Sequence, residues 1–390
     1  MDAPSIALLL VGVLVAAALL VWAVEIRTPR RIRWSAATLA GSGAASAPGL
    51  VLQHAEGTTV WATRAYSIYR SSDGGPFERV ARVRPAWGEA WGGYLRSLRR
   101  TFGYQELVEL WPLDDDRLVV FAGGHVHRLD LRAGTRERGF ELRYFGRGRG
   151  RGLMAFGLDR TADGTFYFAE YVTESGNRPT GVWRSRDDGA TWQLAYEFDA
   201  GTVRHIHAVH GDPRDGSVWI GTGDRDEHSF VGRSTDGGDS YEWVGRDAQL
   251  YRTCAFASFD ASVIWAMDAD FEQNHVLAWD RATQTVTTGS ELPDVTYYAR
   301  RQDDQHALLG LAQGVAEVWV ADAQARAVPW LSFPVTGVPP NRGPSPGVRL
   351  ARGTGGDDVY VNPLRTIDHE STIFRLAARD MPRPDAAAGA

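Results

Sequence analysis

The hydrophobic positions of this chain follow two different patterns. Residues Ile6 to Val24 form one uninterrupted run of 19 uncharged, mostly aliphatic residues. After this run, short apolar segments such as Leu118–Phe121 and Val218–Ile220 alternate with turn residues, and no long helical period appears. The first pattern predicts a single transmembrane helix, and the second predicts an all-β domain.

The N-terminal run has the length of a membrane span. At the rise of an α-helix it covers about 28 Å, close to the thickness of a bilayer's hydrocarbon core. Only Asp2 is charged before it, so it lacks the basic start of a cleavable signal peptide. An arginine cluster at positions 27, 30, 31 and 33 follows it instead. By the positive-inside rule we expect a single-pass signal anchor with the following domain on the cytoplasmic side, and the exported side is the alternative.

These patterns predict the following domain layout. We expect an N-terminal flank over residues 1–4 and a transmembrane anchor over 5–25, with residues 6–24 in the membrane. A basic flank and flexible tether over 26–48 leads to a β domain over 49–380, and residues 381–390 form a disordered tail. The tether prediction rests on the small residues from Gly41 to Pro48.

Three segments repeat one turn-like pattern, Ser-x-Asp-x-Gly followed by an aromatic residue. They are Ser71–Phe77, Ser185–Trp192 and Ser234–Tyr241, and a strand-like run precedes each of them. Asp and Ser side chains cap turn amides, while Gly supplies a positive φ, so the pattern predicts a β-hairpin turn. From Ser185 to Ser234 the step is 234 − 185 = 49 residues, about one four-stranded propeller blade. We therefore segment the chain into seven blades, at about 50–84, 105–145, 153–199, 203–246, 249–289, 294–333 and 347–378.

The repeated pattern resembles the Asp-box, or BNR repeat, of β-propellers. The resemblance implies a seven-bladed β-propeller in which each box lies at the turn between the third and fourth strands of a blade. Asp73, Asp187 and Asp236 are therefore expected to be structural residues. A pair of β-sandwiches is the alternative fold.

Polar residues gather where three successive blades should meet one face. In a propeller the first strand of a blade starts at the face where the second strand ends. The candidate catalytic residues at such positions are Glu170, His205, His207, Asp224 and Asp268, and the candidate substrate-binding residues are Tyr171, Tyr251 and Arg252. Their common placement predicts a polar site on this face.

Several chemistries remain open for this site. His205 and His207 are two residues apart, so on a strand both point to one side, and with Asp224 they are candidate ligands for a divalent metal such as zinc or calcium. A hydrogen-bonded polar ring around a solvated channel is the alternative. Glu170 and Asp224 are a candidate acid and base pair for glycoside chemistry. Arg252 is a candidate clamp for a substrate carboxylate or, alternatively, an ion-pair partner of Asp268.

The central third of the chain also resembles a bacterial group of Asp-box propellers described as sialidase-like or glycosyl-hydrolase BNR proteins. The phrases that carry this resemblance are Ala169–Tyr171, Asn177–Arg178, Arg204–Val209, Asp212–Pro213, Val218–Asp224 and Gln249–Arg252. It implies carbohydrate binding. True sialidases share an Arg-Ile-Pro motif, and the segment Arg31–Arg33 lacks its proline; their arginine triad is not assigned in this chain. Asp-boxes also occur in non-enzymatic sorting receptors and assembly factors.

Three functions follow as hypotheses. The first is a membrane-anchored propeller that binds a glycan or a protein partner, the second is a glycoside hydrolase or polysaccharide lyase, and the third is an assembly factor for a membrane complex. The formal net charge of −6 does not favour nucleic acid as a partner. Cys254 is the only cysteine, so no disulfide can form within the chain.

Overall fold

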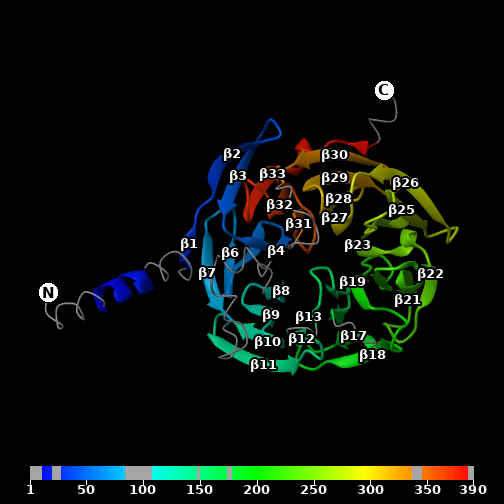
Figure 1. Cartoon of the computed structure of the whole chain (residues 1–390), viewed down its shortest axis with the longest axis horizontal. Helices are drawn as coiled ribbons and strands as arrows, with labels where there is room; N and C mark the ends of the chain where they lie inside the picture. Colours follow the sequence, from blue (N-terminus) through cyan, green and yellow to red (C-terminus); the bar gives the residue numbers. More distant parts are fainter. Residues whose placement is uncertain are drawn as a thin grey trace.

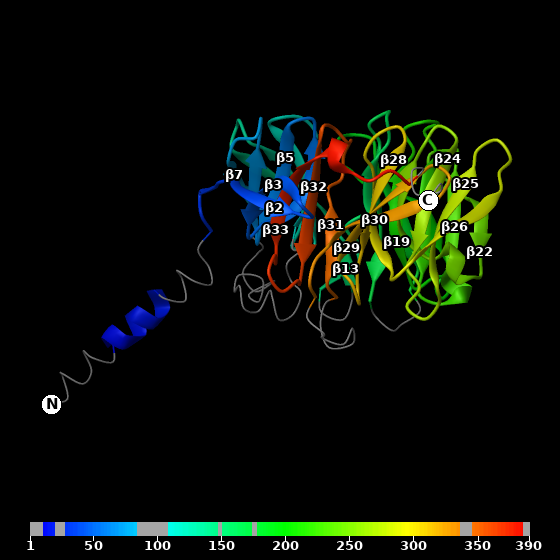
Figure 2. The same ribbon diagram turned by 90° about the horizontal axis from the view of Figure 1, so that it is seen from above.

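The molecule is a ring of β-sheets. A computed structural model describes residues 11–19, 28–83, 108–146, 150–173, 178–335 and 345–384. Within them, seven antiparallel sheets are arranged as blades around one axis (Figure 1). Viewed at right angles, the ring is a disc whose strands run between two faces (Figure 2). The predicted seven-bladed all-β propeller is therefore confirmed.

The first six blades are built along the chain from the axis outwards. The first holds β4 (Val51–Glu56), β5 (Thr59–Arg64), β6 (Ser67–Ser71) and β7 (Phe77–Arg82), and the second holds β8 (Val108–Pro112), β9 (Arg117–Ala122), β10 (His125–Asp130) and β11 (Thr135–Glu141). The third holds β14 (Leu158–Arg160), β15 (Phe166–Ala169), β17 (Thr180–Ser185) and β18 (Gln193–Phe198), and the fourth holds β19 (His205–Gly211), β20 (Val218–Gly223), β21 (Phe230–Ser234) and β22 (Glu242–Arg246). The fifth holds β23 (Thr253–Ser258), β24 (Ser262–Met267), β25 (Asn274–Asp280) and β26 (Val286–Leu292), and the sixth holds β27 (Thr296–Arg301), β28 (His306–Leu311), β29 (Glu317–Asp322) and β30 (Ala327–Ser332).

Smaller elements complete the description. A three-stranded sheet joins β12 (Phe145–Gly146), β13 (Gly150–Gly152) and β16 (Tyr171–Val172). Single 3-10 turns are η2 (Asp226–His228), η3 (Gln249–Tyr251) and η5 (Ala378–Asp380).

The seventh blade closes the ring by combining both ends of the chain. Its inner strands are β31 (Gly347–Leu350), β32 (Asp358–Leu364) and β33 (Thr372–Ala377), and its outer strands are β3 (Ser42–Pro48) and β2 (Ser35–Leu39). β3 pairs antiparallel with β33, with Ala47 opposite Ile373. In addition, β1 (Arg31–Ile32) pairs with β7 of the first blade. The N-terminal segment thus covers the outer edges of the first and the last blade.

The flexible tether predicted over Gly41–Pro48 is wrong. Its small residues have little intrinsic strand preference, and on composition alone they are typical of a linker. The outer edge of β33 offers unpaired backbone groups, however, and pairing with them makes the segment a strand. Of the predicted tail, residues 385–390 lie outside the described residues, and Pro384 is buried.

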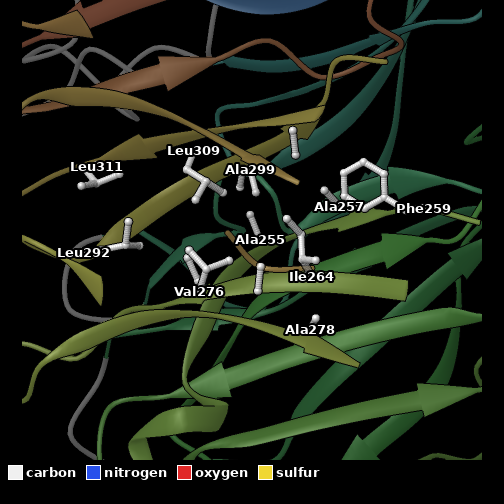
Figure 3. Packing of buried hydrophobic residues seen from close by; sticks show 14 residues of the cluster. Ala255, Ala257, Phe259, Ile264, Val276, Ala278, Leu292, Ala299, Leu309 and Leu311 are labelled. Atoms are coloured by element: carbon white, nitrogen blue, oxygen red, sulfur yellow. The ribbon is translucent and has the colours of Figure 1, made fainter. Parts of the chain in front are cut away.

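The core lies between neighbouring blades. All residues of β20, β23 and β24 are buried, because strands near the axis are covered on both sides, whereas the outer strand β18 is mostly exposed. Between the fifth and sixth blades, Ala255, Ala257 and Ala299 pack with larger residues such as Ile264 and Leu309 (Figure 3). These alanines lie on β23 and β27, where the blades approach one another near the axis.

The three Ser-x-Asp-x-Gly repeats occupy the turns between third and fourth strands. Asp187 lies between β17 and β18, and its carboxylate accepts hydrogen bonds from Ser185 Oγ (2.8 Å), Thr191 N (2.9 Å) and Thr191 Oγ1 (2.6 Å). Asp236, between β21 and β22, accepts the same set from Ser234 and Ser240. These bonds hold the pKa of Asp236 at about 2. Asp73 lies between β6 and β7 and accepts from Thr58 Oγ1. Asp187 and Asp236 therefore stabilise the turns of their own repeats, whereas Asp73 contacts the turn between β4 and β5.

The predicted membrane span falls largely outside the described residues. Residues 11–19 form a helix. None of the helices in the described ranges is both long and apolar enough to cross a bilayer.

Candidate functional site

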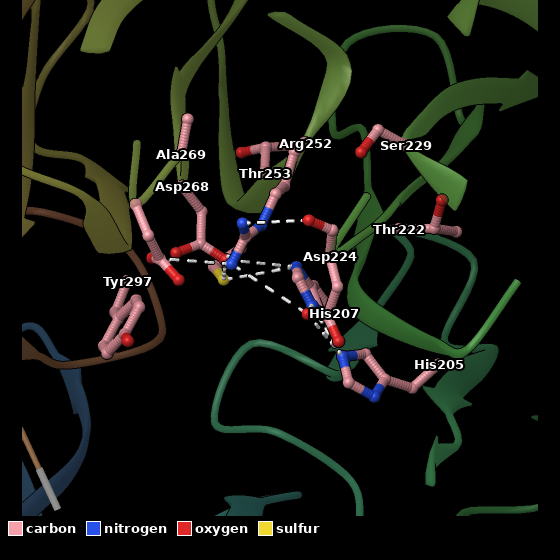
Figure 4. A network of polar contacts seen from close by, with 12 residues as sticks. His205, His207, Thr222, Asp224, Ser229, Arg252, Thr253, Asp268, Ala269 and Tyr297 are labelled. Atoms are coloured by element: carbon pink, nitrogen blue, oxygen red, sulfur yellow. Dashed lines mark hydrogen bonds and ion pairs between the residues drawn. The ribbon is translucent and has the colours of Figure 1, made fainter. Parts of the chain in front are cut away.

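Two neighbouring blades bring the main polar residues together at one end of the inner strands. His205 opens β19, and its backbone pairs with Gly223, directly before Asp224. In the next blade, Arg252 precedes β23, whose Thr253 pairs with Met267, directly before Asp268. Because the start of each first strand meets the end of each second strand, the four side chains converge (Figure 4). Of the predicted site residues, His205, His207, Asp224, Arg252 and Asp268 form one cluster.

The two histidines face each other through their Nε2 atoms. His205 Nε2 lies 2.9 Å from His207 Nε2, and both side chains are buried. His205 Nδ1 lies 2.8 Å from the carbonyl oxygen of Val172. Because a carbonyl oxygen can only accept a hydrogen bond, His205 Nδ1 carries a hydrogen. When the ring has no second hydrogen, its Nε2 carries a free lone pair. The ring is also held by Tyr171, which stacks on it at 4.0 Å between centroids.

Asp224 adds a carboxylate to this pair. Its Oδ1 lies 3.3 Å from His205 Nε2 and 3.7 Å from His207 Nε2, while Oδ2 accepts from Arg204 Nη1 at 2.5 Å. Burial works to raise the pKa of Asp224, but its bonds to the two histidines hold that pKa well below its usual range. The backbone of Asp224 has φ 141°, a conformation that L-residues rarely adopt. Strained backbone of this kind clusters at functional sites, where the surrounding structure maintains it.

A second layer lies behind His207. Its Nδ1 is 3.4 Å from Asp268 Oδ2 and 3.5 Å from Cys254 Sγ, and the thiol donates to Asp268 Oδ2 at 3.3 Å. Burial raises the pKa of Cys254 and raises that of Asp268 to about 7, and it lowers the pKa of His207 to about 4. His207 is therefore neutral, and with a hydrogen on Nδ1 toward Asp268 it presents a second lone pair on Nε2.

Three acceptor atoms then point at one position: His205 Nε2, His207 Nε2 and Asp224 Oδ1. Their mutual repulsion is relieved by a proton on one ring or by a cation between them. Ligand atoms at about 2.1 Å from a tetrahedral zinc ion are separated by about 3.3 Å. The observed separations of 2.9, 3.3 and 3.7 Å surround this value. The residues present therefore fit a divalent metal, with Val172 O and Asp268 orienting the two imidazoles.

Arg252 is engaged by the protein itself. Its Nε lies 3.3 Å from Asp268 Oδ2, and its Nη2 lies 3.6 Å from Asp270 Oδ1. Its Nη1 donates to the carbonyl oxygen of Asp224 at 3.1 Å. The guanidinium is buried. This arrangement agrees with the ion-pair alternative, and Arg252 also supports the backbone that carries Asp224.

Two predicted site residues lie elsewhere. Glu170 is buried, and its carboxylate accepts from Arg143, the Gly181 amide and Trp183 Nε1. These bonds occupy it in the third blade, so the predicted pairing of Glu170 with Asp224 is not formed. The ring of Tyr251 lies against the backbone of Gly245 in β22, away from the cluster.

Sequence reasoning missed three contributors to the cluster. Cys254 is two residues beyond Arg252, so strand alternation was the signal that could have placed it on the same side. Asp270 and Gln313 lie outside the predicted set; Gln313 Nε2 donates to Asp270 Oδ1 at 2.7 Å and to the Tyr297 hydroxyl at 3.0 Å. These two contacts extend the site to the sixth blade, which the sequence pattern alone did not connect to it.

Comparisons with known proteins establish the fold class. No protein-family model and no curated protein matches the sequence. The chain is similar in structure to an oligogalacturonate lyase from Vibrio parahaemolyticus, with a TM-score of 0.57 and 6% identity over 89% of this chain and 96% of that one. A puromycin hydrolase (TM-score 0.47, 12% identity, 83% of this chain and 59% of that one) and TolB from Acinetobacter baumannii (0.42, 12%, 77% and 63%) are more distant. The chain is thus a seven-bladed β-propeller with a polar, metal-compatible site where two blades meet.

Proposed function

We propose that the cluster of His205, His207 and Asp224 binds a divalent metal ion and that the propeller uses it to bind an acidic carbohydrate. The observation that carries this proposal is the convergence of three acceptor atoms from residues that are each fixed by a second contact. A bound divalent cation would supply an attachment point for a sugar carboxylate. Zinc is the first candidate, because imidazole and carboxylate ligands suit it, with calcium as the alternative.

The carbohydrate part rests on two weaker supports. The Asp-box turns resemble those of sialidase-like propellers, and the neighbour with a TM-score of 0.57 is described as an oligogalacturonate lyase. A galacturonate oligomer carries one carboxylate per sugar, which suits a cationic attachment point. We infer the ligand class from these features and not its identity.

A lyase acting on the same ligand is the second candidate function. Such a reaction removes a proton from the carbon next to the carboxylate and breaks the glycosidic bond on the neighbouring carbon. A double bond forms between these two carbons, and the leaving sugar oxygen takes up a proton. The feature that favours it is Asp268, a buried carboxylate with a pKa near 7 that contacts His207. A glycoside hydrolase would need a pair of carboxylates facing the sugar, and Glu170 is not available to form one with Asp224.

Calorimetric metal titration tests the first proposal. Zinc, manganese and calcium are titrated into the wild type, His207→Ala and His127→Ala. The control also belongs to a His-x-His pair, His125 and His127 on β10, but that pair has no carboxylate beside it among the described contacts. We expect stoichiometric binding to the wild type and to His127→Ala and its loss in His207→Ala. Equal binding by all three proteins would reject this site.

Sugar binding is then measured with metal present and absent. Oligogalacturonate and a neutral oligosaccharide of the same length are compared, and new double bonds are followed by ultraviolet absorbance. Metal-dependent binding of the acidic oligomer supports the binding module, and product formation supports the lyase. If metal binds and neither sugar does, a protein partner becomes the next hypothesis.

Membrane attachment through Ile6–Val24 also belongs to the proposal. The run of 19 uncharged residues and the arginines that follow it support a single-pass anchor with a cytoplasmic propeller. Alkaline extraction of membranes tests the anchor, and protease protection of sealed vesicles tests the side. An exported propeller would suit an extracellular glycan better.

A further inference from the structure

A second buried polar cluster lies among the inner strands of the first, second, sixth and seventh blades. It contains Arg300 on β27, Arg349 and Arg352 at the end of β31, His54 and Gln53 on β4, and Glu109 on β8. All six side chains belong to residues that are more than nine-tenths buried. None of them belongs to the site described above.

Arg300 is the cation of this cluster that lacks a carboxylate partner among the described residues. Glu109 Oε2 accepts from Arg349 Nη2 at 2.6 Å and from Arg352 Nη2 at 2.8 Å. Asp159 also acts on Arg352, but its Oδ2 accepts from Gly211 N and is bonded to His210. Arg300 has no ion pair among the described residues; its Nη2 donates only to the carbonyl of Thr354. A buried charge without a partner costs several kcal/mol, so this arrangement calls for an anion.

Unpartnered nitrogen atoms mark where that anion would lie. Arg300 Nε and Nη1, Arg352 Nε and His54 Nδ1 are all buried without a hydrogen-bond partner. The three residues meet at one loop: the backbone of Arg352 bridges to His54, Gly353 lies against the His54 ring, and Thr354 accepts from Arg300. Burial, followed by the charges of Arg352 and Arg300, lowers the pKa of His54, which is therefore a neutral donor.

We propose that Arg300, Arg352 and His54 form a binding site for a small oxyanion, either phosphate or a carboxylate. Guanidinium groups match such anions because they present parallel N–H donors, and charge-assisted bonds of this type are the stronger class of hydrogen bond. The bound anion would neutralise the charge of Arg300 and offer acceptors to the four nitrogen atoms. Thr354 also lines a cavity of about 480 Å³ with Gln302, Gly355 and Gly356.

The site differs from the proposed metal site in every residue. It therefore stands or falls independently of the proposed function. An anionic ligand here would link the first, sixth and seventh blades near the point where the ring closes, and its binding would stabilise the closed ring.

Thermal unfolding of the full chain in buffers of equal ionic strength tests the proposal. Inorganic phosphate and acetate are each titrated against chloride, with wild type, Arg300→Met and Arg300→Lys side by side. We expect a saturable rise in the unfolding temperature of the wild type with at least one of the two anions, and none for Arg300→Met. At 100 times the dissociation constant, a ligand that binds only the folded state adds about 2.7 kcal/mol, a readily measured shift. In chloride alone, Arg300→Met should unfold at the same or a higher temperature than the wild type, because it removes an unpaired buried charge.

Two results would overturn the proposal. An equal and unsaturable response in all three proteins would mean a bulk salt effect, with water alone covering Arg300. A lower unfolding temperature of Arg300→Met in chloride would mean that the guanidinium is already satisfied without an anion. Arg300→Lys keeps the charge and should bind the anion at least about tenfold more weakly than the wild type. Line broadening of the phosphate ³¹P resonance measures the affinity of Arg300→Lys even if Arg300→Met fails to fold. His207→Ala should keep the full anion response.

Discussion

His205 and His207 present their Nε2 atoms to each other at 2.9 Å, with Asp224 Oδ1 3.3 Å from the first and 3.7 Å from the second. Two neutral imidazoles cannot hydrogen-bond through two bare lone pairs. In the absence of a cation, a hydrogen must therefore lie between these atoms, and a neutral His207 that carries its hydrogen on Nε2 instead of Nδ1 can supply it. A metal ion and this hydrogen compete for the same position.

Metal binding should consequently release protons. Zinc is titrated calorimetrically into the protein in two buffers of different ionisation enthalpy at the same pH, and the difference in observed enthalpy counts the protons released. We expect release of up to about one proton per metal ion, fewer if the hydrogen only moves from Nε2 to Nδ1 of His207, and weaker binding as the pH falls. An enthalpy that does not depend on the buffer would show that no proton is displaced from the histidine pair.

Arg252 should be required for stability through Asp268. Removing the guanidinium by Arg252→Met leaves the buried Asp268 carboxylate without its ion-pair partner, and burial has already raised the pKa of this group to about 7. Removing one partner of a buried ion pair costs about 3–5 kcal/mol, so Arg252→Met should lower the free energy of unfolding by about this amount. Asp268→Asn introduced into Arg252→Met should recover much of the loss, as measured by denaturant unfolding of all four proteins of the cycle. Additive losses would contradict the ion pair and restore the substrate-clamp hypothesis for Arg252.

The fold could be predicted from the sequence because the motifs that indicate it are local and repeated. The turns around Asp187 and Asp236 use the hydrogen bonds that Ser, Asp and Thr make with nearby amides, and their spacing reports the blade length. The strand β3 could not be predicted from the sequence, because its small residues become a strand only through pairing with β33, more than 300 positions away in the chain. Tertiary pairing here overrides local preference.

The candidate site was predictable to the extent that strand ends identify it. His205, Asp224 and Asp268 follow from the rule that first strands start where second strands end. The rule gives no side-chain direction or partner, so it could not show that Arg143 engages Glu170 or that Tyr251 packs on Gly245. The cationic cluster around Arg300 escaped prediction because its members come from both ends of the chain.

Closure of the ring should depend on β3. Ala47 is fully buried on β3, opposite Ile373, and packs in the core shared by the first and last blades. Ala47→Asp places a charge in this core and should lower the free energy of unfolding by about 3 kcal/mol or more. Ala36→Asp, an exposed alanine on β2, is the matched control and should change stability by less than about 0.5 kcal/mol. Equal effects in chemical unfolding would mean that the pairing of β3 with β33 does not hold the ring closed.

The pair of His210 and Asp159 should make stability depend on pH. Burial and the charge of Arg281 work to lower the pKa of His210. The hydrogen bond of its Nδ1 to Asp159 Oδ2, at 2.9 Å, and the charges of Asp159 and Asp212 outweigh them. The net effect of folding is to raise the pKa of His210 above 6.5. A histidine whose pKa is raised by folding contributes stability that is complete below the unfolded value, and the contribution is lost as the pH rises through the folded value. The difference in unfolding free energy between wild type and His210→Gln should therefore shrink as the pH is raised from 6 toward 8, roughly across the range in which histidine titrates. Asp159→Asn should remove the same dependence, and a difference that grows with pH would contradict the assignment.

Phe271 should contribute to carbohydrate binding if the proposed function holds. It is 70% exposed, in the loop that follows β24, three residues beyond Asp268 and next to Asp270, which Gln313 and Arg252 hold in place. An exposed aromatic ring beside a polar site offers a face on which a sugar ring can stack, and such a contact is worth about 1 kcal/mol. Phe271→Ala should therefore weaken the binding of oligogalacturonate about fivefold while zinc affinity stays unchanged. Trp243→Ala removes an aromatic residue that is 36% exposed on the outer strand β22 and should leave both affinities as they are. If Phe271→Ala binds the sugar as the wild type does, the sugar does not extend over this loop, and the metal cluster alone would have to account for the recognition.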